Sequence, residues 1–243
     1  MKADIRIFKD SSSLSQAATE MFVKMAEQAI HARGRFLAAL SGGGTPAELY
    51  RLLAKEPYRV QVDWANTFVF WGDERCVTPD DEGSNYHQAM DALLSHVPIP
   101  DENIQRVKGE LEPTEASKSY ARALKDFASP PLDWPRFDLV LLGMGADGHT
   151  ASLFPGSEVE PTAPTQAVTA NYQGRPANRV TLTPLVFNSA RQIIFLVTGE
   201  SKSDILARVI NGELHPRELP AQRIRPTDGK VTWLADEAAG RKL

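Results

Sequence analysis

The sequence predicts an α/β fold built on a mostly parallel sheet, and three observations lead to this class. Short apolar runs alternate along the chain with longer segments of helical periodicity. The apolar runs are continuous, as is typical of strands that are buried on both faces. Glycine-rich or charged turns follow several of them. Strands that alternate with helices are joined by crossovers, which place neighbouring strands parallel in one sheet.

The apolar runs locate the strands of this sheet. Four runs predict core strands, at residues 36–40, 67–71, 138–142 and 193–197. Two further runs, 180–183 and 231–234, predict strands nearer the end of the chain.

The segments between the strands predict helices. Residues 14–30 carry apolar side chains at three- and four-residue steps, which form one apolar stripe along a helix. Shorter helices are expected at 46–54, 84–96, 114–128 and 203–211. The proline-rich patches at 130–135 and 155–164 are expected to be surface loops. No Gly/Ser linker, charge block or internal repeat divides the chain, so residues 1–243 are predicted to be one domain.

The composition argues against a general affinity for polyanions. The 243 residues include 27 basic and 31 acidic side chains, which give a formal net charge of −4. Proteins that coat nucleic acid normally have a basic excess, so nucleic-acid binding is not expected, although a local anion site is compatible with this average.

Cysteine content and hydropathy indicate the compartment. Cys76 is the only cysteine, which excludes an internal disulfide and any multi-cysteine metal site. No apolar segment has the length of a signal peptide or of a transmembrane helix. We therefore expect a cytoplasmic protein that does not bind membranes.

A glycine-rich turn follows the first core strand. It consists of Ser41, Gly42, Gly43, Gly44 and Thr45. Thr45 and Glu48 form a capping-box pattern, and Pro46 stands at the first helical position, so a helix is expected to start here. Backbone N–H groups at a helix N-terminus form an anion site, to which the hydroxyls of Ser41 and Thr45 would add donors. No Gly-Lys-Ser/Thr follows, so a nucleotide triphosphate is not implied.

An ordinary tight turn is the alternative interpretation of this segment. Three consecutive glycines exceed what such a turn needs, so phosphate binding is favoured.

Charged residues follow the next core strand. Asp73, Glu74 and Arg75 come directly after the apolar run 67–71, at the sheet edge where ligands bind in α/β folds. The fork of N–H groups on Arg75 suits a phosphate or a carboxylate. From this segment alone, an exposed loop with an Asp/Arg ion pair is an equal alternative.

The segment after the strand at 138–142 contains a glycine motif. Gly143, Gly145 and Gly148 satisfy the G-x-G-x-x-G pattern of dinucleotide sites. That pattern usually opens the first βα unit and is followed by an acidic residue about 20 positions later. Here it lies in mid-chain before a proline-rich loop, and Asp147 would place a negative charge beside a pyrophosphate. We therefore expect no dinucleotide site.

The same segment favours acid–base chemistry. Its glycines let the chain turn tightly enough for Asp147 and His149 to approach one ligand. An imidazole near its ordinary pKa suits general-base activation of water. A structural or surface histidine is the usual interpretation of a lone histidine, but His149 ends a glycine-rich strand exit.

Two cations complete the candidate set. Arg179 begins the strand-like run 179–183, and Lys202 falls in the first turn of the helix predicted at 203–211. A lysine there opposes the helix dipole, so an anion nearby would compensate it. A solvated lysine is the alternative.

Taken together, these segments resemble the 6-phosphogluconolactonase family, which is related to the glucosamine-6-phosphate isomerase/deaminase group. The matching segments are 41–46, 71–75 with 84–86, 143–156, 179–183 and 198–202, in the order of the family. The stretch 148–155 is the most specific of them.

The resemblance implies hydrolysis of 6-phospho-D-glucono-1,5-lactone to 6-phospho-D-gluconate, in the oxidative branch of the pentose phosphate pathway. It implies a three-layer α/β/α Rossmann-like domain that needs no cofactor and no metal. By analogy, residues 41–45, Arg179 and Lys202 would hold the phosphate, and His149 would activate the attacking water. Arg75 would lie near the substrate, and Asp147 would orient His149 or contact sugar hydroxyls. The oxyanion would be stabilised by N–H groups or by Arg75.

Two other functions stay open. One is a glucosamine-6-phosphate isomerase/deaminase-like enzyme, and the other is a non-catalytic sugar-phosphate-binding module. The sequence after His149, residues 150–156, is similar to the lactonase version. A regulator would normally carry a DNA-binding segment, and only one predicted helix precedes the first core strand. A monomer or a weak homodimer is expected.

Overall fold

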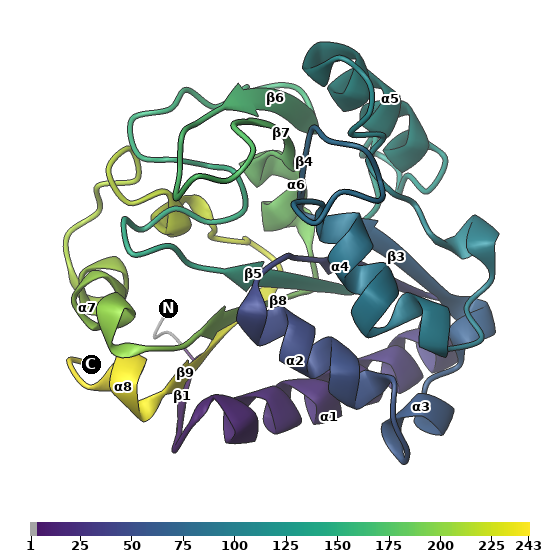
Figure 1. Ribbon diagram of the computed structural model, residues 1–243, viewed down its shortest axis with the longest axis horizontal. Coiled ribbons are helices and arrows are strands. Elements are labelled where there is room, and N and C mark those ends of the chain that lie inside the picture. Colours follow the sequence, from purple (N-terminus) through teal and green to yellow (C-terminus); the bar gives the residue numbers. More distant parts are fainter. Residues whose placement is uncertain (1–3) are drawn as a thin grey trace.

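Six parallel strands form the main sheet of the protein, which the computed structural model describes over residues 4–243 (Figure 1). In spatial order they are β1 (Asp4–Phe8), β9 (Lys230–Asp236), β8 (Gln192–Val197), β5 (Leu139–Gly143), β2 (Phe36–Leu40) and β3 (Thr67–Trp71). Every neighbouring pair is parallel. The predicted α/β class with a mostly parallel sheet is therefore confirmed.

The strand order reverses between β2 and β5. From β2 the chain adds β3 on one side, whereas β5, β8 and β9 follow one another on the other side. In open α/β sheets, such a switch point leaves a crevice at the carboxyl ends of the two strands, where ligands bind. The sheet order thus places a candidate site beyond Leu40 and Gly143.

Helices cover both faces of this sheet, and the alternation of side chains along β2 shows the two layers. Phe36, Ala38 and Leu40 pack with α1 (Ser11–Arg33), α2 (Gly44–Leu53) and α4 (Asn85–Ala92). Leu37 and Ala39 point to the other face, where the core includes residues of α5 (Pro113–Lys125), α6 (Pro184–Ser189), α7 (Ser203–Asn211) and α8 (Glu237–Gly240). One short helix, α3 (Tyr58–Gln61), follows α2. Short 3₁₀ turns lie at Trp64–Asn66, Leu94–His96, Asp101–Asn103, Glu200–Lys202 and Pro220–Arg223.

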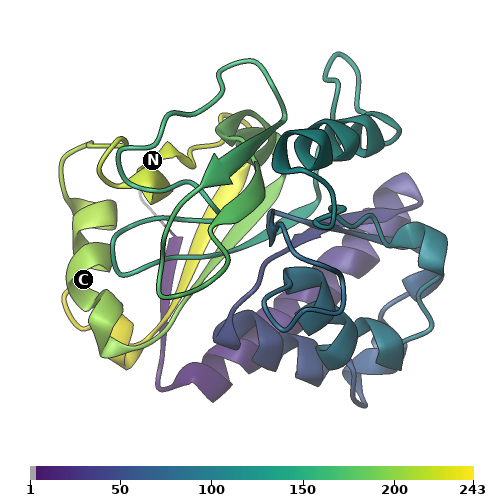
Figure 2. The same cartoon turned by 45° about the horizontal axis from the view of Figure 1, so that its top comes forward.

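A second, antiparallel sheet lies over the same face as α5 and α6. It contains β4 (Asp73–Arg75), β7 (Asn178–Leu182) and β6 (Thr165–Thr169), in that order. Figure 2 shows its two longer strands, in green, in front of the parallel sheet. Residues 180–183 therefore do contain a strand, but it belongs to this sheet and not to the main one.

Gly72 joins the two sheets. Its N–H donates to the carbonyl of Leu40 at 2.8 Å, and its carbonyl accepts from the N–H of Leu182 at 2.9 Å. The chain thus leaves β3 in the parallel sheet and enters β4 in the antiparallel one within a single residue.

The helix predicted at 84–96 is interrupted. α4 ends at Ala92, and a 3₁₀ turn follows. The hydroxyl of Ser95 donates to the carbonyl of Met90 at 2.6 Å, and His96 Nε2 bonds the carbonyl of Asp91 at 2.8 Å. Side chains that take up the last carbonyls replace the helical hydrogen bonds and end the helix.

The other predicted elements are close to the observed ones. α1 and α5 differ from the predictions 14–30 and 114–128 by a few residues at each end, and α7 has the predicted bounds. Neither proline-rich patch contains a helix or a strand. Among residues 4–243, no helix combines the length and the apolar character that crossing a bilayer requires.

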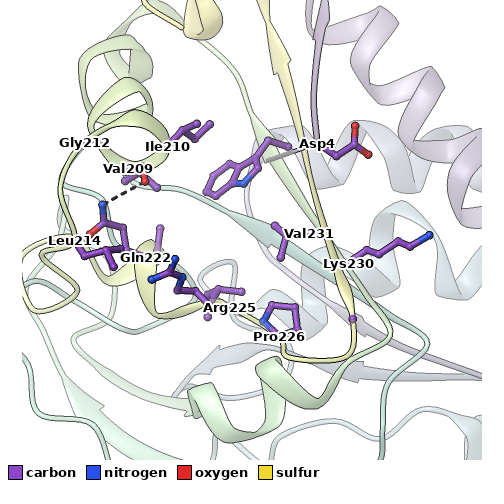
Figure 3. A pocket seen from close by; sticks show the side chains of 14 residues that line it. Asp4, Val209, Ile210, Gly212, Leu214, Gln222, Arg225, Pro226, Lys230 and Val231 are labelled. Atoms are coloured by element: carbon purple, nitrogen blue, oxygen red, sulfur yellow. Dashed lines mark hydrogen bonds between the residues drawn. The ribbon is translucent and has the colours of Figure 1, made fainter. Parts of the chain in front are cut away.

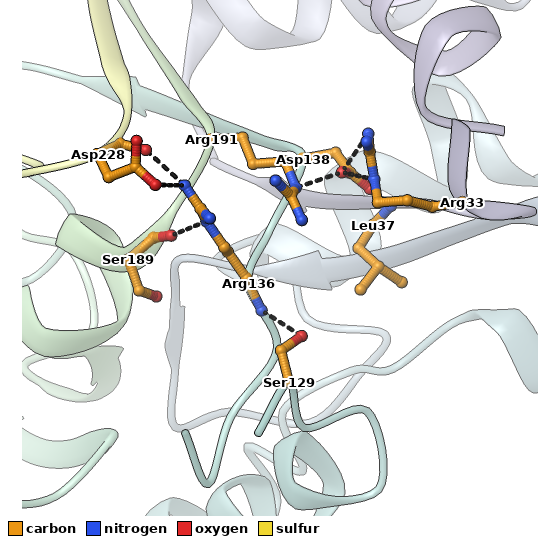
Figure 4. Close-up of polar contacts among 8 residues, drawn as sticks. All are labelled: Arg33, Leu37, Ser129, Arg136, Asp138, Ser189, Arg191 and Asp228. Carbon is orange, nitrogen blue, oxygen red and sulfur yellow. Dashed lines mark hydrogen bonds and ion pairs between the residues drawn. The ribbon is translucent and has the colours of Figure 1, made fainter. Parts of the chain in front are cut away.

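Asp138 fixes the amino-terminal ends of the central strands, at the edge opposite the switch point (Figure 4). Its Oδ2 accepts from the N–H of Leu37 at 2.9 Å, which ties β5 to β2. Its Oδ1 accepts from Arg33 Nε at 3.0 Å and lies 3.3 Å from Arg191 Nε. Burial raises the pKa of Asp138, and the Leu37 N–H and the two guanidinium groups partly offset this rise.

We expect Asp138→Ala to lower the free energy of unfolding by about 2–3 kcal/mol, because it leaves a buried N–H on Leu37 without an acceptor. Equilibrium unfolding in urea measures this change. Asp228→Ala is the matched control: its carboxylate pairs with Arg136 but is 90% exposed, so about 0.5 kcal/mol or less should be lost. Equal losses in the two variants would contradict the anchoring role of Asp138.

Candidate active site

The turn after β2 is built around glycine at the switch point. Gly43 has φ +116° and precedes α2, and a Cβ on Gly42 would lie 1.8 Å from Oδ1 of Asn85. Neither position accepts a side chain without displacement of the chain or of Asn85. Two of the three consecutive glycines therefore have a structural cause, and the exit of β2 lies close against the start of α4.

The predicted capping box at Thr45 is wrong. α2 begins at Gly44 with Gly43 as its N-cap, and no side chain caps it. Thr45 thus lies inside the first turn, and its hydroxyl bonds the hydroxyl of Thr198 after β8 at 2.8 Å. The reason is that the glycine turn is complete one residue earlier than the Thr45–Glu48 pattern implies.

The loop after β5 brings Asp147 and His149 together. The Nδ1–H of His149 donates to Oδ1 of Asp147 at 2.6 Å, and the same oxygen accepts from the backbone N–H of His149 at 3.2 Å. Gly148 has φ +81°, and a Cβ on Gly145 would lie 2.1 Å from the imidazole Nδ1. The loop can hold this pair because glycine occupies both positions.

Asp147 is held in its charged form. Burial raises its pKa, but the hydrogen bond and the charge of His149 outweigh burial, so the pKa of Asp147 lies below its ordinary value. A carboxylate on Nδ1 keeps the proton on that nitrogen and leaves Nε2 as the basic one.

The glycine motif at 143–148 lacks the context of a dinucleotide site. No helix follows it, because the next regular element after β5 is strand β6. A pyrophosphate would therefore find no helix N-terminus here. Nor do three His, Cys, Asp or Glu side chains within residues 4–243 come together in a group that could hold a metal ion.

Two arginines face each other on the second sheet. Arg75 of β4 and Arg179 of β7 are direct partners in the antiparallel register, and they are only 9% and 2% exposed. Like charges directly opposite each other destabilise a sheet, so an anion bound beside the two arginines would stabilise this arrangement. Burial lowers the pKa of Arg179, with the charge of Arg75 acting in the same direction and that of Asp73 against it.

The exposed-loop alternative for residues 73–75 is wrong, because all three are buried in β4. Glu74 has a structural role, since its carboxylate accepts from the backbone N–H groups of Asn85 and Tyr86, both at 2.7 Å, at the start of α4. Asp73 accepts from the hydroxyl of Ser152 at 2.6 Å.

Several buried polar atoms near the arginines have no hydrogen-bond partner within residues 4–243. They are Ser41 Oγ, Arg75 Nε, Asn85 Oδ1, and Nε and Nη2 of Arg179. Leaving buried polar groups unpaired is unfavourable, and such groups recur at functional sites.

Lys202 lies at the end of a 3₁₀ turn, one residue before α7 begins, and not in the first turn of that helix. The tight turn arises because Gly199 has φ +93° and its N–H is held by the carboxylate of Asp236 at 3.0 Å. Burial lowers the pKa of Lys202, and the charge of Asp147 opposes this shift.

These groups meet around one cavity of about 230 Å³. It is lined by every residue of the predicted site except Asp147: Ser41, Gly42, Gly43, Gly44, Thr45, Arg75, His149, Arg179 and Lys202. Asp147 instead lies against Nδ1 of His149. The charged lining groups other than His149 are Arg75, Arg175, Arg179, Lys202 and one carboxylate, Asp73. A chain of net charge −4 therefore has a locally cationic pocket.

Sequence reasoning missed several lining residues. Asn85 enters the sequence-based prediction only as part of a matching segment, and Tyr172, Gln173 and Arg175 do not enter it. These last three lie in the loop between β6 and β7, which has no periodic pattern. A tyrosine and an arginine within a short polar loop were the available signal.

A larger cavity of about 450 Å³ lies elsewhere, beside α7 and β9 (Figure 3). Its lining is mostly apolar, and its charged members are Asp4, Arg225 and Lys230. It contains no histidine and none of the unpartnered buried atoms described above. The smaller cavity is therefore the candidate active site.

The chain is similar to known proteins over most of its length. The sequence model of the family described as glucosamine-6-phosphate isomerases/6-phosphogluconolactonase matches residues 9–233. The 6-phosphogluconolactonase of Nostoc sp. is 38% identical over 245 residues, which cover 100% of this chain and 99% of the relative. That of Haemophilus influenzae is 40% identical over 205 residues, 84% of this chain and 86% of the relative. The solved 6-phosphogluconolactonase of Trypanosoma cruzi superposes with a TM-score of 0.88 at 29% identity, over 100% of this chain and 97% of the other.

We expect Gly145→Ala to break the bond between Asp147 and His149, because its Cβ would lie 2.1 Å from Nδ1 and 2.5 Å from Oδ1 of Asp147. The ¹⁵N shifts of the His149 ring would then show a mixture of tautomers. Gly143→Ala is the control, because a Cβ there meets no atom within 4 Å. An unchanged Nδ1–H tautomer in Gly145→Ala would show that the loop adapts without loss of the pair.

Proposed function

The chain belongs to the glucosamine-6-phosphate isomerase/6-phosphogluconolactonase family, and from this premise we propose that it hydrolyses 6-phospho-D-glucono-1,5-lactone to 6-phospho-D-gluconate. This is the hydrolase step of the oxidative pentose phosphate pathway. The observation that carries the proposal is the Asp147–His149 hydrogen bond beside a pocket with two facing, buried arginines. A base for water and a site for an anion thus share one cavity.

The cationic part of the pocket binds the substrate phosphate. Residues 41–45 line it at the N-terminus of α2 and contribute the hydroxyls of Ser41 and Thr45. The N–H groups of Ser41 and Gly43 already donate to Tyr50 Oη at 3.0 Å and to Gln88 Oε1 at 2.8 Å. The backbone N–H groups of Gly42, Gly44 and Thr45 are left to bind the phosphate. Arg179 and Lys202 supply the charge. A phosphate there would relieve the repulsion between Arg179 and Arg75 and would offer acceptors to the unpartnered N–H groups.

His149 acts as the general base in the proposed mechanism. Its Nε2 takes a proton from water as the water oxygen attacks the lactone carbonyl carbon, and a tetrahedral oxyanion forms. Arg75 or nearby N–H groups stabilise the oxyanion. The bond between this carbon and the ring oxygen then breaks, and the imidazolium returns its proton to the ring oxygen.

Asp147 orients His149 rather than binding a sugar hydroxyl. It is engaged with Nδ1 and does not line the cavity. Its charge also stabilises the imidazolium that forms during the attack.

The two alternative functions differ from this one in measurable products. An isomerase/deaminase would release ammonia from glucosamine 6-phosphate, and a binding module would bind sugar phosphates without turnover. We favour the lactonase because relatives with that name match the chain over most of its length.

The remaining expectations stay predictions. One domain is supported by the pairing of β1, near the start of the chain, with β9, near its end. A cytoplasmic location is supported by the single cysteine. A monomer or weak homodimer, with no nucleic-acid or membrane partner and no cofactor, stays a prediction from the sequence and its family resemblance.

We expect the protein to accelerate acid release from freshly generated 6-phospho-D-glucono-1,5-lactone above the spontaneous rate. His149→Ala should lose roughly 10²–10⁴-fold in kcat, because the general base is removed. It should keep its fold and its affinity for 6-phosphogluconate, since the residues that bind the phosphate are unchanged.

His215→Ala is the matched control for this assay, because that histidine side chain is half exposed and does not line the cavity. It should keep normal turnover. No acceleration by the unmutated protein would exclude the lactonase function, and near-normal turnover of His149→Ala would move the base to another group.

We expect the affinity for 6-phosphogluconate to fall on the alkaline side earlier than an exposed lysine would allow. Burial lowers the pKa of Lys202 from 10.5, so the ammonium loses its proton, and with it its attraction for phosphate, at a lower pH. Calorimetric titrations between about pH 7 and 10 measure this alkaline limb, the decrease in affinity with rising pH. Lys202→Arg should remove it because arginine stays charged. The same alkaline limb in both proteins would show that another group titrates.

A further inference from the structure

The imidazole of His149 has aromatic neighbours as well as Asp147. The centroid of the Phe154 ring lies 4.6 Å from that of His149 with an interplanar angle of 31°, and the Tyr172 ring lies at 4.6 Å with an angle of 77°. Phe154 and Tyr172 are themselves 5.9 Å apart. The catalytic imidazole is thus packed against two rings that also contact each other.

These rings come from different parts of the fold. Phe154 belongs to the same loop as His149 and is 8% exposed. Tyr172 instead belongs to the turn between β6 and β7 of the antiparallel sheet. It reaches the imidazole from outside the loop that carries the Asp147–His149 pair.

One hydrogen bond does not fix the plane of an imidazole. The Nδ1–H bond to Asp147 restrains the ring, but the imidazole can still swing about its two side-chain torsions if the carboxylate, which is 36% exposed, moves with it. A ring packed at a steep angle against the imidazole blocks this swing. The direction in which Nε2 points at the cavity that His149 lines therefore depends on this packing.

We propose that Tyr172 is a positioning residue for His149. The aromatic ring of Tyr172 holds Nε2 of His149 in the direction from which this nitrogen takes the proton of the attacking water. This inference rests on the proposed function of His149 as the base. It assigns the loop between β6 and β7 a part in catalysis that does not require contact with the substrate.

The turn is built to present Tyr172 in this way. The N–H of Arg175 donates to the carbonyl of Tyr172 at 3.1 Å, and the N–H of Ala170 donates to the carbonyl of Ala177 at 2.9 Å. Gln173 and Gly174, which lie between Tyr172 and Arg175, have φ of +50° and +66°. Two successive left-handed residues reverse the chain directly after Tyr172.

The phenol itself is a poor candidate for proton transfer. Burial raises the pKa of Tyr172, and the charge of Asp147 acts in the same direction. The hydroxyl therefore stays neutral where His149 works as a base. The ring, and not the hydroxyl, is the part that the proposal uses.

The test compares Tyr172→Ala with Tyr172→Phe. Tyr172→Ala should lower kcat for the lactone roughly tenfold, the size of effect that a small misplacement of a catalytic group produces. Its dissociation constant for 6-phosphogluconate should stay within about twofold of the unmutated value, because the cationic groups are unchanged. Tyr172→Phe keeps the ring and should restore kcat.

A second measurement does not depend on turnover. The proton on Nδ1 of His149 should exchange slowly with water in the unmutated protein and in Tyr172→Phe, and faster in Tyr172→Ala, as seen in its low-field NMR resonance. If the lactone proves not to be a substrate, the proposed function fails, but this measurement still decides whether Tyr172 positions the imidazole.

Asn171→Ala is the control for a loosened turn, because Asn171 is exposed and does not line the cavity. It should behave as the unmutated protein in both measurements. Unmutated kcat with a slowly exchanging proton in Tyr172→Ala would overturn the proposal. A Tyr172→Phe variant as slow as Tyr172→Ala would also overturn it, because the hydroxyl would then be the working group.

Discussion

The adjacency of β2 and β5 is the constraint on which the rest of the site depends. These strands are distant in sequence but pair in parallel through Ala38 with Leu139 and Ala39 with Val140. Two glycine-rich segments therefore begin at the same edge of the sheet, where these strands end. One begins at Ser41 and the other at Gly143. One segment opens a helix and the other bends back through the Asp147–His149 pair, so the anion site and the base face one cavity. Asp138 fixes the other end of the same pair of strands.

The antiparallel sheet contributes two arginines, Arg75 and Arg179, to the cavity at the edge of the parallel sheet. Because Gly72 turns the chain from β3 directly into β4, Arg75 is brought opposite Arg179 under the same cavity. This placement is unfavourable in the absence of a bound anion, since two arginine side chains are buried at directly opposed positions of the sheet. Groups held in such a state are already desolvated and oriented when an anion arrives, so less reorganisation accompanies binding.

The sequence was sufficient for the local parts of this structure. Continuous apolar runs such as 36–40 identify buried strands because burial on both faces leaves no room for polar alternation. Gly145 and Gly148 mark the catalytic loop because a side chain does not fit at either position. The order of the strands, and with it the switch point, depends on pairing between distant segments and has no local signature. For the same reason, the three-residue strand β4 and the approach of Tyr172 to His149 emerged only from the fold.

The place of β1 in the sheet has a consequence for the order of assembly. Among the strands that the structure describes, β1 is an edge strand and pairs with β9 alone, and Asp4 of β1 accepts a hydrogen bond from the Thr232 hydroxyl at 3.0 Å. During synthesis the chain leaves the ribosome in the direction from amino to carboxyl terminus, so β1 emerges before the other strands of the sheet and β9 after them. The central strands can therefore form while β1 still has no partner, and this edge of the sheet closes only when β9 joins it.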